Sequence, residues 1–214
     1  MRSPFFALCS FAVLASAGCA APAMPTELFN GHDFAGWEFV TTPATDIGAV
    51  CKIQPDGVIA AAGAPVGFIA TTARYENFRL HAEWRWPGKP GNGGVLLHIA
   101  SGPKDRAWPL SLQVQLKNKS AGDLLPMAGA TFTEPLTSAA GAPPARTHTA
   151  PDSEQAAGAW NTCDVVCRDG TVEVEINGVV QNQVTGVSPR AGRIGFQFES
   201  APFELRHVRV VRLD

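Results

Sequence analysis

The sequence predicts an all-β protein, a two-sheet β-sandwich of the jelly-roll type. Three observations favour this fold class. Apolar and polar residues alternate with a period of two in many short segments, Gly, Pro, Asn and Asp separate those segments, and helical periodicity is almost absent. Strands at such spacing, with no helices between them, are typical of sandwiches and jelly rolls.

Length, composition and charge indicate the size of the domain and exclude some classes of binding partner. The chain has 214 residues, of which 45% are hydrophobic and 17% are charged. These values suit one large all-β domain with a sizeable core and exclude a disordered chain. The formal net charge is −2, so the chain has no electrostatic footprint for nucleic acid or for an anionic membrane.

Residues 1–23 have the pattern of an export signal, and residues 24–214 form the predicted domain. Arg2 is followed by FFALCSFAVLASA, an apolar stretch too short to span a bilayer, and then by small residues. Two kinds of cleavage stay open. SAGC resembles a bacterial lipoprotein signal with a lipid on Cys19, whereas ASA fits ordinary signal peptidase. We expect a periplasmic or cell-surface protein that contacts a membrane only through such a lipid.

The five cysteines allow at most one disulfide within the domain. Cys9 leaves with the leader, and Cys19 is either lipidated or removed. Cys163 and Cys167 lie four residues apart in a strand-like run, about 13 Å along it, which is too far to bridge. A disulfide therefore requires Cys51, and buried reduced thiols are the alternative.

The domain begins with ELFNGHDFAGWEFV, in which the turn former Asn30–Gly31 separates Phe29 from Trp37. We expect these rings to bury against a large sandwich rather than against each other. Trp37 should join Phe196 and Phe198 of the closing strands in the core.

The strand-like segments that follow are 57–63, 67–75, 78–86, 93–100, 110–118, 161–186, 192–200 and 203–213. Within 161–186, the sequences RDG and NGV predict the turns of a hairpin array. The segment 124–159 is rich in Ala, Gly, Pro, Thr and Ser and is too long for an ordinary connection. It is either a functional loop or a variable surface insertion.

The sequence lacks the motifs of several common enzyme classes. The sequence contains no Gly-x-Ser-x-Gly elbow, no Walker lysine loop and no His-Glu-x-x-His, and the glycine-rich GKPGNGG precedes a strand rather than a helix. His81, His98 and His207 fall in strand segments, as ordinary half-buried residues do. We therefore expect no cofactor and no metal site.

Polar residues in and beside the strands form the candidate site. Glu83 and Arg85 share one face of their strand, and Gln113 and Gln115 share one face of theirs. We expect Glu83 to face a pocket with Arg85, and Gln113 or Gln115 to lie within reach on the adjoining strand. Carboxylates and amides hydrogen-bond hydroxyls, and an indole such as Trp108 stacks on a pyranose, so the pattern suits a carbohydrate. The alternative is a solvated outer face.

Five blocks of the sequence, in order from Glu27 to the C-terminus, resemble the bacterial 3-keto-disaccharide hydrolase domain. The blocks are LFNGHDFAGW, NFRLHAEWRWPGKPGNGGVLLH, WPLSLQVQLKNKSAGD, GAWNTCDVVCRDGTVEVEINGVV and GRIGFQFESAPFELRHVRV. The resemblance implies a concanavalin A-like lectin/glucanase fold, export, and hydrolysis of 3-keto-glycosides or 3-keto-disaccharides. It also implies that LFNGxDxxGW is the first strand and docks beside the last one.

The implied chemistry is an elimination. A ketone at C3 acidifies the hydrogen on C2, so a modest base can expel the leaving sugar, and addition of water completes net hydrolysis. The residues that suit the base or acid are Glu83, His98 and Asp123. Arg85 and Asn92 suit the polarisation of the keto oxygen. The remaining substrate-binding candidates are Trp108, Gln113, Gln115, Trp160 and Asn161.

The chain departs from the family pattern at two positions. The family often has Glu where this chain has Gln113, and Gly-Glu-Trp-Asn where this chain has Gly-Ala-Trp-Asn with Ala159. Gln113 cannot carry a proton. The alternative function is therefore a carbohydrate-binding sandwich without catalysis. A third class, a structural or protein-interaction sandwich, leaves the polar strand faces unexplained.

Overall fold

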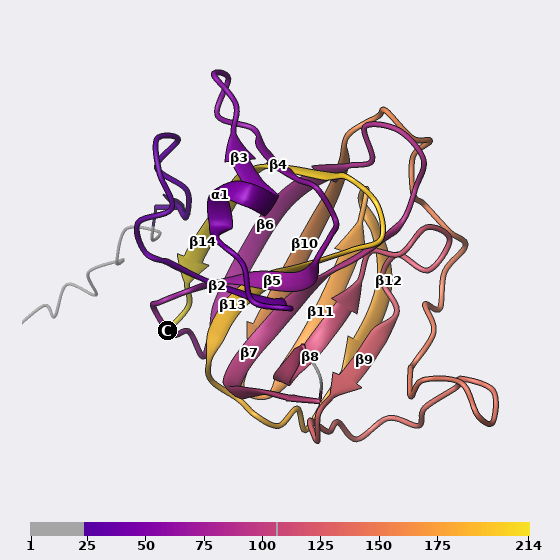
Figure 1. Ribbon diagram of the computed structural model, residues 1–214. Coiled ribbons are helices and arrows are strands. Elements are labelled where there is room, and N and C mark those ends of the chain that lie inside the picture. Colours follow the sequence, from indigo (N-terminus) through magenta and orange to yellow (C-terminus); the bar gives the residue numbers. More distant parts are fainter. Residues whose placement is uncertain (1–23, 106) are drawn as a thin grey trace, which may run out of the picture.

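The computed structural model describes residues 24–105 and 107–214, and its regular secondary structure is almost entirely β-strand (Figure 1). The predicted export signal, residues 1–23, lies outside the described residues. The elements are β1 (Thr26–Glu27), β2 (Trp37–Thr42), α1 (Ile47–Val50), β3 (Cys51–Ile53), β4 (Ile59–Ala61), β5 (Val66–Thr71), β6 (Phe78–Arg85), β7 (Asn92–Asp105), β8 (Trp108–Gln115), β9 (Leu124–Met127), β10 (Asn161–Arg168), β11 (Thr171–Ile176), β12 (Val179–Val184), β13 (Arg193–Glu199) and β14 (Phe203–Arg212). No helix among the described residues is long and apolar enough to cross a membrane.

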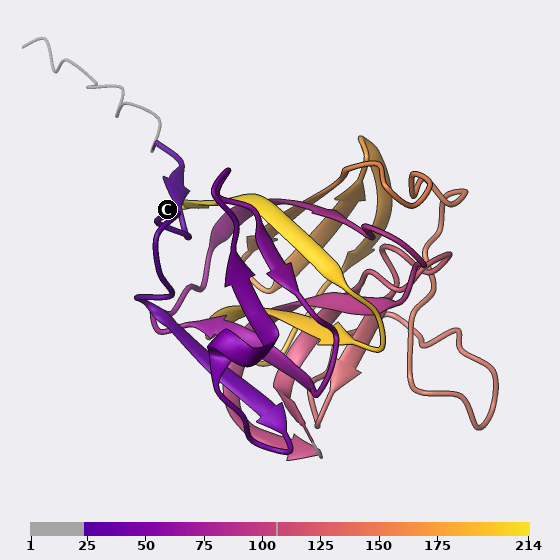
Figure 2. The same cartoon turned by 45° about the horizontal axis from the view of Figure 1, so that its top comes forward.

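The strands form two antiparallel sheets that pack face to face (Figures 1 and 2). Sheet A has the order β12-β11-β10-β6-β14-β4-β3, with β1 beside β14, and sheet B has the order β2-β5-β13-β7-β8-β9. The predicted all-β sandwich is confirmed. The chain passes from sheet A to sheet B between β6 and β7, and this crossing decides where the candidate site residues lie.

The core between the sheets takes the inward residues of each alternating strand. Phe196 and Phe198 are 0% and 1% exposed, and Trp37 is 9% exposed, so the predicted burial of these rings is confirmed. Trp84 and Trp86 of the β6 region are fully buried as well. Burial of side chains of this size is the main favourable contribution to folding.

The strand that docks beside β14 is β1, which precedes the motif LFNGHDFAGW, so the expectation that this motif forms the first strand is wrong: residues 28–36 are outside the strands and Trp37 begins β2 in sheet B. β1 pairs with β14, with Thr26 opposite Val210. The expectation about the two aromatic rings is wrong in one respect, because Phe29 and Trp37 stack on each other with centroids 4.0 Å apart and planes 5° from parallel. The side chain of Asn30 accepts backbone hydrogen bonds and reverses the chain between them. The stacked pair then reaches the core through Trp37.

The three domain cysteines are reduced and buried, as the alternative to a disulfide predicted. Burial raises the pKa of Cys51 to about 12 and raises the pKa of Cys163 and Cys167 even further.

The hairpin array of residues 161–186 is confirmed as β10, β11 and β12. Its turns place Asp169, Gly170, Asn177 and Gly178 at positive φ, between 51° and 79°, which is the conformation that tight hairpin turns require. Between β9 and β10 the described chain forms only isolated bridges and runs along one side of the sandwich (Figure 1).

Candidate functional site

The predicted site residues lie on opposite faces of the molecule. Glu83 and Arg85 project from β6 in sheet A, whereas Gln113 and Gln115 project from β8 in sheet B. The prediction that they form one pocket is therefore wrong. Alternation along a strand determines which residues share a face, but it does not determine which sheet the strand joins.

A groove of about 450 Å³ lies on the outer face of sheet B. Its described lining residues are mostly amides, apolar side chains and prolines: Asn92, Trp108, Gln113, Gln115, Lys117, Leu125, Pro126, Met127, Ala128, Pro143, Pro144, Gln197 and Glu199. Four of the predicted binding residues are thus brought together. The segment between β9 and β10 supplies Pro143 and Pro144, so part of this long connection forms a wall of the groove.

The register of sheet B explains the polar floor of the groove. Asn92 on β7 is opposite Glu199 on β13, and Gln197 is opposite Gly94. Gly94 is in turn opposite Gln115 on β8. Residues opposite one another in antiparallel strands project to the same face, so these side chains gather around Gly94.

Gly94 has no side chain, and the carboxamide of Gln113 occupies the space above it. A Cβ on Gly94 would lie 2.6 Å from Gln113 Nε2. The same nitrogen donates to Gln115 Oε1 at 3.2 Å, and Gln115 Oε1 also accepts from the backbone of Leu116 and Lys117. The two glutamines are therefore held in one arrangement before any ligand arrives.

Glu199 supplies the carboxylate of the groove. Its Oε2 accepts hydrogen bonds from Asn92 Nδ2 at 2.7 Å and from Gln197 Nε2 at 3.0 Å. Among the described lining residues it is the one carboxylate, and Lys117 is the one cation. Within the described chain, the hydrogen bonds of the carboxylate fall on Oε2, which leaves Oε1 for a ligand.

Three amide oxygens at the groove lack a hydrogen-bond partner in the described structure: Asn92 Oδ1, Gln113 Oε1 and Gln197 Oε1. Gln113 and Gln197 are only 1% and 3% exposed. A buried acceptor without a donor costs about 1–3 kcal/mol. These three oxygens expose almost no surface to the groove, so a ligand reaches them only after the amides reorient.

The outer face of sheet A carries an ion-pair network. Glu83 accepts from Arg206 Nε at 2.7 Å, and its other oxygen lies 2.7 Å from His207 Nδ1. Burial raises the pKa of Glu83, but the hydrogen bonds from His207 and Arg206 outweigh it, so this pKa lies below its usual value. Both carboxylate oxygens of Glu83 are thus already engaged, one by Arg206 and the other by His207.

Arg85 and Trp160 belong to the same network on sheet A. Arg85 Nε lies 2.5 Å from Glu204 Oε2. The guanidinium carbons of Arg85 and Arg206 lie 4.5 and 4.0 Å from the centre of the Trp160 ring. The ring therefore contacts cations of this chain, and neither residue lines the groove on sheet B.

His98 is 2% exposed and lies outside the groove lining. Its ring packs edge-on against Phe78, and its Nε2 lies 3.0 Å from the backbone oxygen of Glu76. Burial lowers the pKa of His98. Its positive φ of 54° marks an irregularity in β7.

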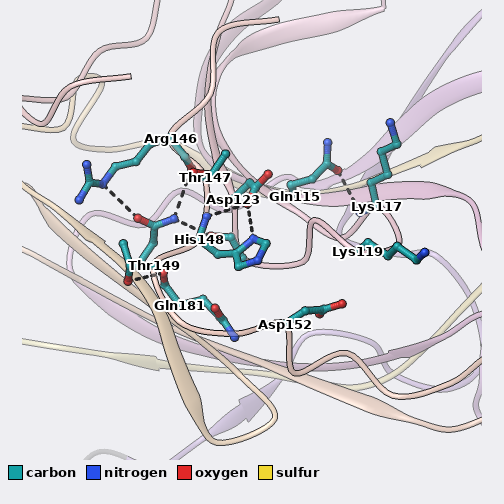
Figure 3. Close-up of polar contacts among 12 residues, drawn as sticks. Gln115, Lys117, Lys119, Asp123, Arg146, Thr147, His148, Thr149, Asp152 and Gln181 are labelled. Atoms are coloured by element: carbon teal, nitrogen blue, oxygen red, sulfur yellow. Dashed lines mark hydrogen bonds and ion pairs between the residues drawn. The ribbon is translucent and has the colours of Figure 1, made fainter. Parts of the chain in front are cut away.

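Asp123 pairs with a residue that the sequence did not indicate. Asp123 Oδ1 accepts from the backbone nitrogen of His148 at 2.8 Å and lies 2.6 Å from His148 Nδ1 (Figure 3). Nearby, Arg146 forms a backbone bridge with Leu124. These contacts attach the long connection to the edge of sheet B, beside the groove wall.

Asn161 is 1% exposed and joins loops at the other sheet. Its Oδ1 accepts from Gln155 N and from Asn177 Nδ2, each at 2.7 Å. Its position separates it from the groove, as for Glu83, Arg85, His98 and Trp160.

The sequence prediction missed Gln197, Glu199 and Lys117. In GRIGFQFES the first two alternate with the buried Phe196 and Phe198. This alternation already placed Gln197 and Glu199 together on an outer face. Among the described residues, no group of three His, Cys, Asp or Glu side chains is arranged as metal ligands.

Residues 24–211 match the family model described as the 3-keto-alpha-glucoside-1,2-lyase-like domain. The chain belongs to this family. The family predicted from the sequence blocks is thus confirmed. None of the curated proteins matches the chain.

Solved structures resemble the fold. A protein of Parabacteroides distasonis ATCC 8503, named as an inferred glycosyl hydrolase, is 25% identical with a TM-score of 0.64, over 89% of this chain and 94% of that one. The carbohydrate-binding module CBM66 of Bacillus subtilis is 10% identical with a TM-score of 0.59, over 84% and 97%. The Bacillus licheniformis β-glucanase is 9% identical with a TM-score of 0.54, over 91% and 100%. The last two show the fold alone, that of a carbohydrate-related jelly roll.

Proposed function

We propose that the groove on sheet B binds a 3-keto-glycoside and that Glu199 removes the proton from C2. The observation that carries this proposal is the carboxylate of Glu199, oriented by Asn92 and Gln197 in a groove lined by amides. A general base must be positioned first and needs a suitable pKa second. The second oxygen of Glu199 has no hydrogen bond within the described chain, which supports this role.

The reaction that suits this groove is a β-elimination. Glu199 takes the C2 proton, the electron pair forms the C1–C2 double bond, and the C1–oxygen bond breaks. The leaving oxygen takes a proton from water and Glu199 passes the C2 proton to the solvent, so the products are an unsaturated 3-keto sugar and a free hydroxyl compound. Addition of water across the double bond then gives net hydrolysis without a change in oxidation state.

Binding and charge stabilisation come from the remaining groove residues. The amides of Asn92, Gln113, Gln115 and Gln197 line the groove and supply the hydrogen-bonding groups for the sugar hydroxyls. Trp108 offers an indole face to the ring. Lys117 at the rim stabilises the negative charge that develops on the keto oxygen as the C2 proton leaves.

A second function is binding of a carbohydrate without cleavage. The observation that favours it is the glutamine at position 113, because the groove around it is rich in amides and holds one described carboxylate. The two functions differ in turnover. Incubation of the protein with 3-keto-glucosides and with the unoxidised glucosides, followed by product analysis, separates them: the proposed function requires cleavage of the 3-keto compounds alone.

We also propose that the protein is exported. The leader pattern of residues 1–23 supports removal of this segment and a periplasmic or cell-surface location. Intact mass of the protein from its native host tests it. A chain that begins after the leader supports export, a diacylglycerol-sized addition on Cys19 identifies a lipoprotein, and an unmodified chain beginning at Met1 contradicts the proposal.

A further inference from the structure

A second hollow adjoins the groove and shares two residues with it. It has a volume of about 240 Å³, and its described lining residues are Thr42, Val66, Ala107, Trp108 and Glu199. Trp108 and Glu199 line the groove as well. The indole and the carboxylate therefore stand between two spaces on the same face of sheet B.

The register of sheet B explains this position of Glu199. Val66 on β5 is opposite Thr42 on β2, and the neighbouring pair of Gly67 and Phe198 places Val66 next to Glu199 on β13. Asn92 is opposite Glu199 on its other side. The four side chains form a row across four adjacent strands, with Glu199 between the apolar Val66 and the amide of Asn92.

At the level of the groove, the polarity of the outer face changes between β13 and β5. β7, β8 and β13 present Asn92, Gln113, Gln115 and Gln197, whereas β5 presents Phe68 opposite Gln197. Phe68 and Ala70 belong to a buried apolar cluster that reaches across β13 to Leu96 and Ile99 of β7, and Val40 packs against it. The hollow lies at the end of this apolar side, with Val66 and Ala107 in its lining.

We infer that the hollow is the subsite of the leaving group and that it takes a single, largely apolar ring. This inference rests on the proposed function. If Glu199 reaches C2 of a sugar in the amide groove, C1 is one bond away and the leaving group departs beside the same carboxylate. A space of about 240 Å³ next to Glu199 accepts one ring rather than an oligosaccharide.

Because its lining is largely apolar, the subsite should prefer an apolar leaving group to a sugar. A sugar leaving group would bring hydroxyls against Val66 and Ala107, where among the described lining residues only Thr42 and Glu199 offer polar partners. Unpaired hydroxyls lose their hydrogen bonds to water, which is unfavourable. An alkyl or aromatic ring gains from burial in the same space.

One test compares two substrates with the wild-type protein. Cyclohexylmethyl 3-keto-glucoside and the 1→6-linked 3-keto-glucosyl-glucose both release a primary alcohol, so their leaving groups differ mainly in polarity. We expect a KM about 10-fold lower for the cyclohexylmethyl compound. A KM that is equal, or lower for the disaccharide, overturns the apolar assignment.

A second test fills the hollow. Val66→Phe should lower kcat/KM for the cyclohexylmethyl compound by about 10-fold or more, and should leave methyl 3-keto-glucoside within about two-fold. Val180→Phe, the same change at an exposed position of β12, is the matched control and should affect neither substrate. An equal effect of Val66→Phe on both substrates, or no effect with the fold intact, overturns the location of the subsite.

The methyl glycoside separates this inference from the function on which it rests. If the wild-type protein cleaves none of the three 3-keto compounds, the proposed function fails. If it cleaves methyl 3-keto-glucoside but shows no preference among larger leaving groups, the function stands and the inference fails. The comparison of substrates needs no variant, so a folding defect in Val66→Phe does not prevent a decision.

Discussion

Gly94 on β7 and Gln113 on β8 occupy one space at the floor of the groove. A Cβ at position 94 would lie 2.6 Å from Gln113 Nε2 and 3.0 Å from its Cδ. The backbone at Gly94 is an ordinary strand conformation, so the absent side chain serves this close approach rather than a turn. The position of the Gln113 carboxamide thus depends on a residue of the neighbouring strand.

We predict that Gly94→Ala weakens sugar binding by about 5- to 10-fold, because the displaced Gln113 loses its hydrogen bonds to ligand and to Gln115. Titration of the protein with a 3-keto-glucoside measures the effect. Gly88→Ala is the control, since a Cβ at Gly88 meets nothing within 4 Å. Unchanged affinity in a folded Gly94→Ala protein would remove Gln113 from the binding site.

We predict that Lys117→Met lowers kcat by at least about 10-fold with a smaller change in KM, because the cation acts on charge that develops after binding. Lys117→Arg should recover part of the loss, since it keeps the charge. Steady-state kinetics with methyl 3-keto-glucoside give both parameters. A rise in KM alone would limit Lys117 to substrate binding.

The strands and the core were largely predictable from the sequence, because period-two alternation and turn residues are local signals. Phe196 and Phe198 are buried as their strand pattern indicated. The sheet to which each strand belongs was not predictable, since it depends on long-range pairing. Glu83 and Gln113 were therefore placed together although they lie in different sheets.

The contacts made by irregular segments could not be predicted from the sequence either. His148 binds Asp123 from a connection with no periodicity. The stacking of Phe29 on Trp37 follows from the turn at Asn30, whose geometry the residue types alone do not specify. Glu199 was recoverable in principle, because it alternates with buried phenylalanines in its own strand.

We expect Glu83 to contribute to the stability of the fold rather than to catalysis. Its pKa in the folded protein lies below 4.5 as the net result of burial, which raises it, and of the stronger effect of His207 and Arg206. Its contribution to stability is therefore present above about pH 4.5 and is lost as the pH falls through the lower folded value. We expect Glu83→Gln to lower the melting temperature at pH 7, and this difference from wild type should shrink below pH 4.5. Thermal melts of both proteins from pH 3 to pH 7 measure it; a difference that grows on acidification would contradict the account.

The buried cysteines predict slow thiol chemistry. Burial raises the pKa of Cys51, Cys163 and Cys167, and only the thiolate reacts quickly. A chain beginning at residue 24 should thus release almost no colour with Ellman's reagent at pH 8, and three thiols per chain in guanidinium chloride. Rapid reaction of the folded protein would show that at least one thiol is accessible.

Glu199 on sheet B is the proposed general base. The most direct measurement is the turnover of methyl 3-keto-glucoside by the wild-type protein, Glu199→Gln and Glu83→Gln, with folding checked by circular dichroism. We predict a loss in kcat of roughly 100-fold or more for Glu199→Gln, as for removal of a general base, and near wild-type turnover for Glu83→Gln. The opposite result, with Glu199→Gln active and Glu83→Gln inactive although folded, would contradict this proposal. It would indicate that catalysis occurs on the outer face of sheet A.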